Sequence, residues 1–295
     1  MKTPARRLSL AVLLALVTTG AGQTPSRNAL RVEHVVIVVL ENTDYTAAIR
    51  QPFLARLIRD GASLSNFHAV AHPSQPNYIA LTAGTLKGVD SNDPVTLPVR
   101  HIGDLIEARG LSWKAYAENY PGDCYLKEDS GQYVRKHLPF LSFQNIQNDQ
   151  QRCRERIVNA TELARDIANG QLPNYSFYVP NLKNDGHDTD VTFADRWLAH
   201  TFGPLLRDPR FTDKLLLVVT FDEADKDGTN HIYTSLWGAN VRPGSTSTAR
   251  YDHYSLLRTV EDVLGLGRLG TNDATASSII GLWKGNTPAV GKSLR

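Results

Sequence analysis

The chain has 295 residues, of which 41% are hydrophobic and 21% are charged. This composition is typical of a globular protein and excludes disordered, collagen-like and coiled-coil proteins. The formal charge is +2, with 32 basic and 30 acidic residues, and three of the basic residues, Lys2, Arg6 and Arg7, lie close to the N-terminus. Without these three the balance is 29 basic to 30 acidic residues, or −1. The composition therefore gives no support for nucleic-acid binding.

The N-terminus has the pattern of a signal peptide. Its positive residues are followed by a short apolar run at 8–17, by small residues at 19–21 and by a polar segment from Gly22. A membrane-spanning helix needs about 18 apolar residues or more, so this run is too short for a stable membrane anchor. We expect residues 1–22 to be removed and the protein to be secreted or periplasmic. A buried N-terminal helix is the alternative.

The sequence contains two cysteines, Cys124 and Cys153. An even number of cysteines in an exported chain favours a disulfide. The bond would close a loop of about 30 residues and stabilise the protein by about 3–4 kcal/mol. The alternative, a catalytic thiol, has no supporting residues around it.

Apolar runs typical of strands alternate with helical patterns along the chain. In chain order, the expected elements begin with a strand at 35–40, helices at 52–59 and 102–109, a strand at 113–116 and a helix at 160–169. They continue with a strand at 175–179, a helix at 193–206, strands at 215–221 and 233–237, and a helix at 254–264. The alternation predicts an α/β fold, a three-layer α/β/α sandwich with a mainly parallel central sheet. No linker divides the chain, so we expect one domain over 23–295, with loose ends and a core at about 32–283.

Acidic residues follow the two most apolar strands. Glu41-Asn42 comes after the first strand and Asp222-Glu223 after the second. Acidic residues often simply end strands in loops, but the carboxyl ends of parallel strands also meet at the edge where ligands bind. Three carboxylates held together are costly without a cation. We therefore expect a metal site here, in which oxygen ligands favour Mg²⁺, Mn²⁺ or Ca²⁺ over Zn²⁺.

Ser74 lies near the expected start of a helix, two residues before Pro76. A capping serine explains this position without any further function. The same position places a serine oxygen at the positive end of a helix dipole, which favours a phosphate group nearby. With a metal ion alongside, Ser74 would act as a nucleophile.

Two histidines lie in polar segments. His187 follows a strand in the loop 180–188 and is flanked by acidic residues, so it suits a phosphate ligand or a general acid. A turn rich in Asn, Asp and Gly explains part of the same loop. His253 opens the last expected helix and is equally well explained as a residue near a helix cap.

Taken together, these segments resemble the phosphoesterase family that contains acid phosphatases and phospholipases C, within the alkaline-phosphatase-like superfamily. The similarity is greatest to secreted acid phosphatases of the mycobacterial type and extends over about residues 32–266. It is carried by an ordered set of segments: 34–42, 72–78, 133–140, 184–188, 219–223 and 253–266.

The resemblance implies an alkaline-phosphatase-like fold and a role for each matching residue. The implied metal ligands are Glu41, Asn42, Ser74, Asp222 and Glu223, and Ser74 is also the implied nucleophile, through a phosphoserine intermediate. The implied catalytic histidines are His187, His137 and His253, and the residues expected to contact substrate are Asn77, Asp185 and His187.

We predict an exported, metal-dependent phosphomonoesterase that acts on phosphorylated small molecules or lipid headgroups, including phosphoinositides. A phospholipase C or other phosphodiesterase is the alternative, although the glycine-rich stretch usual in that branch does not follow Asp222-Glu223. A sulfatase is disfavoured because Tyr78 stands where its maturation motif needs an arginine. A non-catalytic ligand-binding domain and a serine esterase that uses Ser74 are further alternatives.

Overall fold

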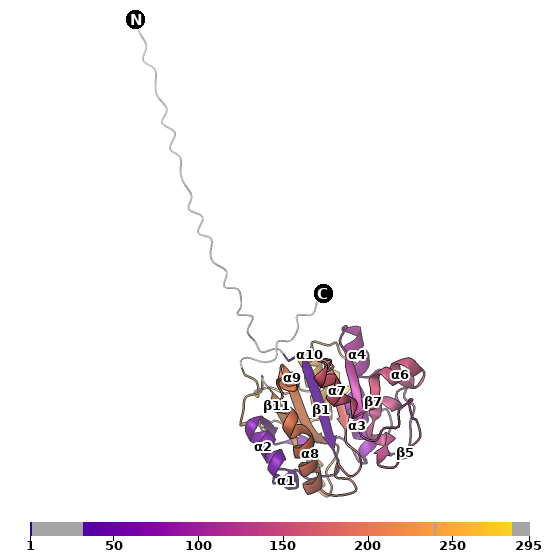
Figure 1. Cartoon of the computed structure of the whole chain (residues 1–295). Coiled ribbons are helices and arrows are strands. Elements are labelled where there is room, and N and C mark those ends of the chain that lie inside the picture. Colours follow the sequence, from indigo (N-terminus) through magenta and orange to yellow (C-terminus); the bar gives the residue numbers. More distant parts are fainter. Residues whose placement is uncertain (2–31, 239, 285–295) are drawn as a thin grey trace.

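The computed structural model describes residue 1 and residues 32–238 and 240–284 (Figure 1). Residue 1 aside, the expected signal peptide at 1–22 lies outside the described residues, as does the segment after 284. Within the described ranges, no helix is both long and apolar enough to cross a bilayer.

A mixed eight-stranded sheet forms the centre of the fold (Figure 1). In spatial order its strands are β12 (Ser245–Ser247), β2 (Ala62–Leu64), β11 (Thr234–Gly238), β9 (Leu215–Phe221), β1 (His34–Leu40), β8 (Tyr175–Val179), β4 (Trp113–Ala117) and β7 (Ile157–Asn159). The strands from β9 to β7 run parallel, whereas β11 is antiparallel to both of its neighbours. The prediction of a mainly parallel sheet is confirmed, and the strand expected at 233–237 is the antiparallel one.

Helices cover both faces of this sheet (Figure 1). One face is covered by α2 (Pro52–Asp60), α7 (Glu162–Ala168), α8 (Val191–Leu205) and α9 (Pro209–Thr212), and the other face by α3 (Ser74–Ala83), α4 (Ile102–Ala108) and α10 (His253–Leu264). Between the larger elements lie α1 (Tyr45–Ala48), α5 (Gln144–Gln147), α6 (Gln150–Arg156), and the 3-10 turns η1 (Arg135–His137), η2 (Pro139–Ser142) and η3 (Asn272–Ala274). The predicted α/β fold is confirmed.

Two smaller sheets accompany the main one. One has the order β10 (His231–Ile232), β3 (Phe67–His68) and β13 (Tyr251–Asp252), and the other pairs β5 (Asp129–Ser130) with β6 (Tyr133–Val134). The predicted disulfide is also present: Cys124 and Cys153 are joined, with their Cα atoms 5.8 Å apart. This bond ties the segment after β4 to α6.

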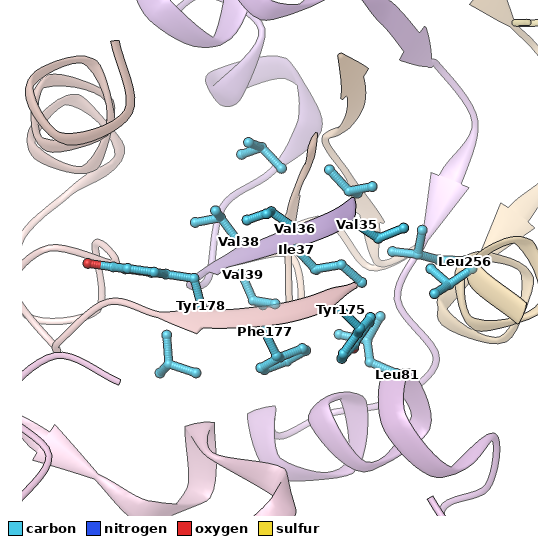
Figure 2. Packing of buried hydrophobic residues seen from close by; sticks show 14 of the residues in the cluster. Val35, Val36, Ile37, Val38, Val39, Leu81, Tyr175, Phe177, Tyr178 and Leu256 are labelled. Carbon is cyan, nitrogen blue, oxygen red and sulfur yellow. The ribbon is translucent and has the colours of Figure 1, made fainter. Parts of the chain in front are cut away.

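The central strand β1 is buried on both faces, as its apolar sequence predicts. Residues 35–40 are at most 1% exposed, and they share one cluster with Leu81 of α3 and Leu256 of α10 (Figure 2). Burying a Val or Leu side chain contributes about 1.5–3 kcal/mol, so the strand is held firmly in place. Its parallel register with β9 runs from His34 opposite Leu215 to Leu40 opposite Phe221. The two strands therefore end at the same level.

Candidate active site

Two acidic segments meet where β1 and β9 end. Because Leu40 lies opposite Phe221, Glu41 and Asp222 follow side by side. The Asp222 backbone N–H donates to the Leu40 carbonyl at 2.9 Å, and Asp222 Oδ1 accepts the Asn42 N–H at 3.1 Å. Glu41 and Asp222 are both buried. The structure thus brings together the two acidic segments that the strand pattern placed at one sheet edge.

Ser74 begins α3 and its hydroxyl lies against both acidic segments. Its Oγ is 3.1 Å from Glu41 Oε2 and 3.3 Å from Glu223 Oε1. Because a hydroxyl has one proton, it donates to one carboxylate at a time. The N-cap residue of α3 is Pro73, so the capping explanation for Ser74 is wrong. Ser74 combines two carboxylate acceptors with a place at the positive end of a helix.

Asn77 holds the loop before Ser74 and does not face a substrate. Its Oδ1 accepts the N–H groups of Val70 and Ala71 at 3.0 Å each. Its Nδ2 donates to the carbonyls of Ala71 at 2.9 Å and Pro73 at 3.3 Å. These bonds use the full capacity of an amide side chain, and Asn77 is completely buried. The expected substrate contact is therefore corrected: Asn77 positions the backbone that leads to Ser74.

The carboxylates repel one another in a buried place. Burial, followed by repulsion from Asp222 and Asp185, raises the pKa of Glu41 well above its usual value. Burial likewise raises the pKa of Asp222, and burial with repulsion from Asp222 raises the pKa of Glu223 to about 8. Asp222 Oδ2 is buried and has no hydrogen-bond partner among the described residues. A cation at this position would offset the cost of burying these groups.

The donors around Ser74 fit a hard divalent cation. Carboxylate, amide and hydroxyl oxygens are the ligands that Mg²⁺, Mn²⁺ and Ca²⁺ prefer, whereas Zn²⁺ favours nitrogen and sulfur. In the described part of the chain, no three His, Cys, Asp or Glu side chains already surround a point where a metal ion would sit. The fit therefore rests on the type of donor, the charge and the unpartnered Asp222 oxygen.

His137 and Tyr78 pack against Glu41. The Tyr78 hydroxyl donates to Glu41 Oε1 at 2.6 Å, and His137 Nε2 lies 3.2 Å from the same oxygen. The two rings stack with their centroids 5.0 Å apart. His137 Nδ1 lies 3.3 Å from Asp185 Oδ2. Burial lowers the pKa of His137 well below its usual value and raises that of Asp185 to about 7. His137 therefore links Glu41 to the loop after β8.

His187 is more open than His137, with 33% of its side chain exposed. Its Nδ1 lies 2.8 Å from Asp188 Oδ1, and its backbone N–H donates to Asp185 Oδ1 at 2.8 Å. Its ring centroid is 6.1 Å from that of His137. An imidazole that is held by a carboxylate beside the buried cluster, yet open to solvent, is suited to contact phosphate or to transfer a proton.

His253 contacts the site through the backbone. It is fully buried, and its Nε2 lies 2.8 Å from the carbonyl oxygen of Asp222. Burial lowers its pKa to about 4. The cap of α10 is the preceding residue, Asp252, whose side chain accepts the Ser255 N–H. The contact shown by the structure is thus with the backbone at the end of β9, and the catalytic role of His253 stays a prediction.

Three further residues near the site had no role assigned from the sequence. Tyr78 follows Ser74 by four residues on α3, so helical spacing alone places both on one face. His72 Nδ1 lies 2.6 Å from Glu223 Oε2, with half of the His72 side chain exposed. The positive charge of Lys136 partly offsets the rise in the pKa values of Glu41 and Glu223. No spacing in the sequence connects Lys136 to them.

Comparison with known proteins finds related phosphatases and a solved structure with the same fold. A probable acid phosphatase of Kluyveromyces lactis is 36% identical over 254 residues, covering 82% of this chain and 60% of that protein. A phosphatidylinositol-3-phosphatase of Mycobacterium tuberculosis is 35% identical over 245 residues, covering 80% and 78% of the two chains. This chain thus spans less than two thirds of the Kluyveromyces relative.

A solved structure shows the same fold. A protein in the alkaline phosphatase superfamily from Vibrio parahaemolyticus has a TM-score of 0.59 at 13% identity, covering 83% of this chain and 70% of that one. This similarity confirms the alkaline-phosphatase-like architecture. Residues 47–267 match the Phosphoesterase family, which is most of the described chain. Given this match and its agreement with the two related phosphatases, the chain belongs to the phosphoesterase family.

Proposed function

We propose that the protein is an exported, metal-dependent phosphomonoesterase of the acid phosphatase type, with Ser74 as its nucleophile. The observation that carries this proposal is the contact of Ser74 Oγ with two buried carboxylates, Glu41 and Glu223, which follow separate strands. The names of the related phosphatases support the same reaction. Export rests on the signal-peptide pattern at 1–22.

The proposed reaction has two steps. Ser74 Oγ releases its proton to solvent water and attacks phosphorus as the bond to the leaving alcohol breaks, and a second water then hydrolyses the phosphoserine. Asn77 fixes the loop that presents Ser74, while the N-terminus of α3 and the Lys136 charge stabilise the negative charge that spreads over the phosphoryl oxygens. His187, which is partly exposed and held by Asp188, donates the proton that the leaving alcohol takes up.

A divalent cation would be held by the oxygens of Glu41, Asn42, Ser74, Asp222 and Glu223. When bound, it supplies positive charge that offsets the repulsion among the carboxylates and lowers the pKa of the serine hydroxyl. The donor set favours Mg²⁺, Mn²⁺ or Ca²⁺.

Ser74→Ala tests the proposal, with Ser130→Ala on β5 as the matched control. Turnover of p-nitrophenyl phosphate is expected to fall by about 10³-fold or more in Ser74→Ala and to stay unchanged in Ser130→Ala. Chelation is expected to abolish wild-type turnover, and one of the three cations to restore it. Mass spectrometry of acid-quenched enzyme is expected to find the phosphate on Ser74.

Three results would overturn parts of this proposal. Unchanged turnover in a folded Ser74→Ala variant excludes Ser74 as the nucleophile. Turnover of bis-(p-nitrophenyl) phosphate above that of the monoester replaces the phosphomonoesterase by a phosphodiesterase. Turnover of carboxylic esters that is insensitive to chelators identifies a serine esterase.

A further inference from the structure

A separate cavity lies at the carboxyl edge of the sheet, beside the proposed active site. Its volume is about 420 Å³, which is within the roughly 300–1,000 Å³ of small-molecule sites. It lies where β4, β7 and β8 end, and these strands continue the parallel sheet beyond β1. Six of the eight residues that line it have polar side chains with amide, aliphatic hydroxyl or carboxylate groups: Glu118, Asn119, Asn159, Thr161, Asn181 and Asn184.

One loop joins this cavity to the active site. Asn184 lines the cavity, and the next residue, Asp185, accepts the Glu41 N–H at 3.0 Å through its carbonyl and lies 3.3 Å from His137. Strand β8, which carries this loop, pairs directly with β1. The cavity and the proposed active site therefore lie at the same edge of the sheet, joined by the loop after β8.

Glu118 is the only carboxylate among the described residues that line the cavity, and its oxygens already accept hydrogen bonds from neighbouring residues. Glu118 Oε2 accepts the Asn181 N–H at 3.0 Å and Asn184 Nδ2 at 2.6 Å. Glu118 Oε1 accepts the Tyr178 hydroxyl at 3.2 Å and Trp197 Nε1 at 3.1 Å. With four donors, this carboxylate holds the wall together and has little capacity left for a ligand.

The asparagine side chains of the cavity retain more capacity for hydrogen bonds to a ligand. Within the described residues, Asn119 and Asn184 each make one side-chain hydrogen bond, whereas an amide side chain can make about four. No lysine or arginine is among the described residues that line the cavity, and Glu118 is negative, so a second phosphate group would be repelled. An apolar group would leave the amides unpaired. Hydroxyl groups both donate and accept, as the amides do.

We propose that this cavity binds the neutral, hydroxyl-rich alcohol part of a phosphate monoester, such as a sugar phosphate or another polyol phosphate. The inference rests on the proposed phosphomonoesterase function and adds its preferred substrate class. Binding of the alcohol part affects KM more than kcat, because the cavity contacts atoms that do not react.

Thr161→Phe fills the cavity from its exposed rim, and Thr246→Phe is the matched control on β12, at the opposite edge of the sheet. The wild-type kcat/KM for glucose 6-phosphate is expected to exceed that for methyl phosphate, whose alcohol is too small to reach the cavity, by about tenfold. Thr161→Phe is expected to remove this advantage through KM and to leave methyl phosphate unchanged. Thr246→Phe is expected to leave both substrates unchanged.

A second variant removes one amide without filling the space. Asn119 has a φ of +58°, a backbone conformation that glycine adopts readily, so Asn119→Gly keeps the loop and deletes the side chain. It is expected to raise KM for glucose 6-phosphate only. Fructose 1,6-bisphosphate is expected to have a lower kcat/KM than fructose 6-phosphate, because its second phosphate meets Glu118.

Binding of free sorbitol, measured by ligand-observed NMR, distinguishes an error in the assignment of the cavity from an error in the proposed function. Turnover of both substrates, with glucose 6-phosphate unaffected by Thr161→Phe, overturns the cavity assignment while the phosphomonoesterase stands. Sorbitol binding that Thr161→Phe abolishes, in a protein that turns over neither substrate, overturns the proposed function and with it the role of the cavity as a leaving-group site.

Discussion

Tyr78→Phe tests the buried hydrogen bond at the centre of the proposed site. The Tyr78 hydroxyl donates to Glu41 Oε1 at 2.6 Å, and both residues are buried. Burial, together with the neighbouring Glu41 charge, raises the pKa of Tyr78 well above its usual value, so the hydroxyl keeps its proton. A hydrogen bond to a charged group contributes about 1.5–3 kcal/mol, and its loss leaves a buried oxygen with a weaker set of partners.

We expect Tyr78→Phe to lower the free energy of unfolding by about 1.5–3 kcal/mol, which corresponds to a fall in Tm of roughly 3–12 °C. Glu41 also contacts Ser74, so kcat/KM for p-nitrophenyl phosphate is expected to fall by about 10–100-fold. Urea unfolding, thermal unfolding and steady-state kinetics measure the two effects.

Tyr116→Phe is the matched control. The Tyr116 hydroxyl donates to Asp166 Oδ2 at 2.6 Å, between β4 and α7, and that carboxylate keeps the Lys114 ammonium at 2.6 Å. The control is expected to lose less stability than Tyr78→Phe and no activity. If Tyr78→Phe retains wild-type kcat/KM, or if the two variants behave alike, the reasoning about Glu41 is refuted.

Three further predictions concern stability. Asp195→Ala is expected to lower the free energy of unfolding in urea by about 2–4 kcal/mol, because the Asp195 carboxylate accepts the first free N–H groups of α2. Asp195→Asn is expected to recover part of this loss, and equal stability of the two variants contradicts the prediction. Reduction of the bond between Cys124 and Cys153 is expected to cost about 3–4 kcal/mol, and an unchanged Tm counts against this. Burial lowers the pKa of His101 to about 4 in the folded protein, whereas the unfolded chain takes up the proton near pH 6.5. As pH drops through this window, the unfolding free energy is therefore expected to fall by up to about 3 kcal/mol more in the wild type than in His101→Asn, which retains a capping acceptor. The same pH slope in both proteins contradicts this prediction.

The sequence was most informative where burial alone determines the structure. The runs at 35–40 and 215–221 predict β1 and β9 because residues covered on both faces must be apolar throughout. The direction of β11 and the two-residue and three-residue strands such as β3 and β12 were not predicted. Their formation depends on pairing with distant segments, and no local pattern of apolar residues records that pairing.

Within the proposed site, too, the sequence predicted the position of some residues but not the contacts that other residues make. The rule that ligands lie at strand ends placed Glu41 near Asp222, since it needs only the strand boundaries. Asn77 and His253 lie close to the site, but they bond backbone atoms, and the spacing of residues carries no information on which way a side chain points. Lys136 acts through its charge at a distance, which also leaves no pattern.

The carboxyl edge of the sheet divides into two regions that a single loop connects. At β1 and β9 the side chains are acidic and buried, which suits the phosphoryl group and a cation. At β8, β4 and β7 they are mainly neutral amides around a cavity, which suits an alcohol part that takes no share in the bond change. Because Asn184 and Asp185 are adjacent in the chain, the loop at 180–188 fixes the distance between the two regions. Substitutions in the cavity are therefore expected to change which ester is bound, and substitutions around Ser74 to change how fast it reacts.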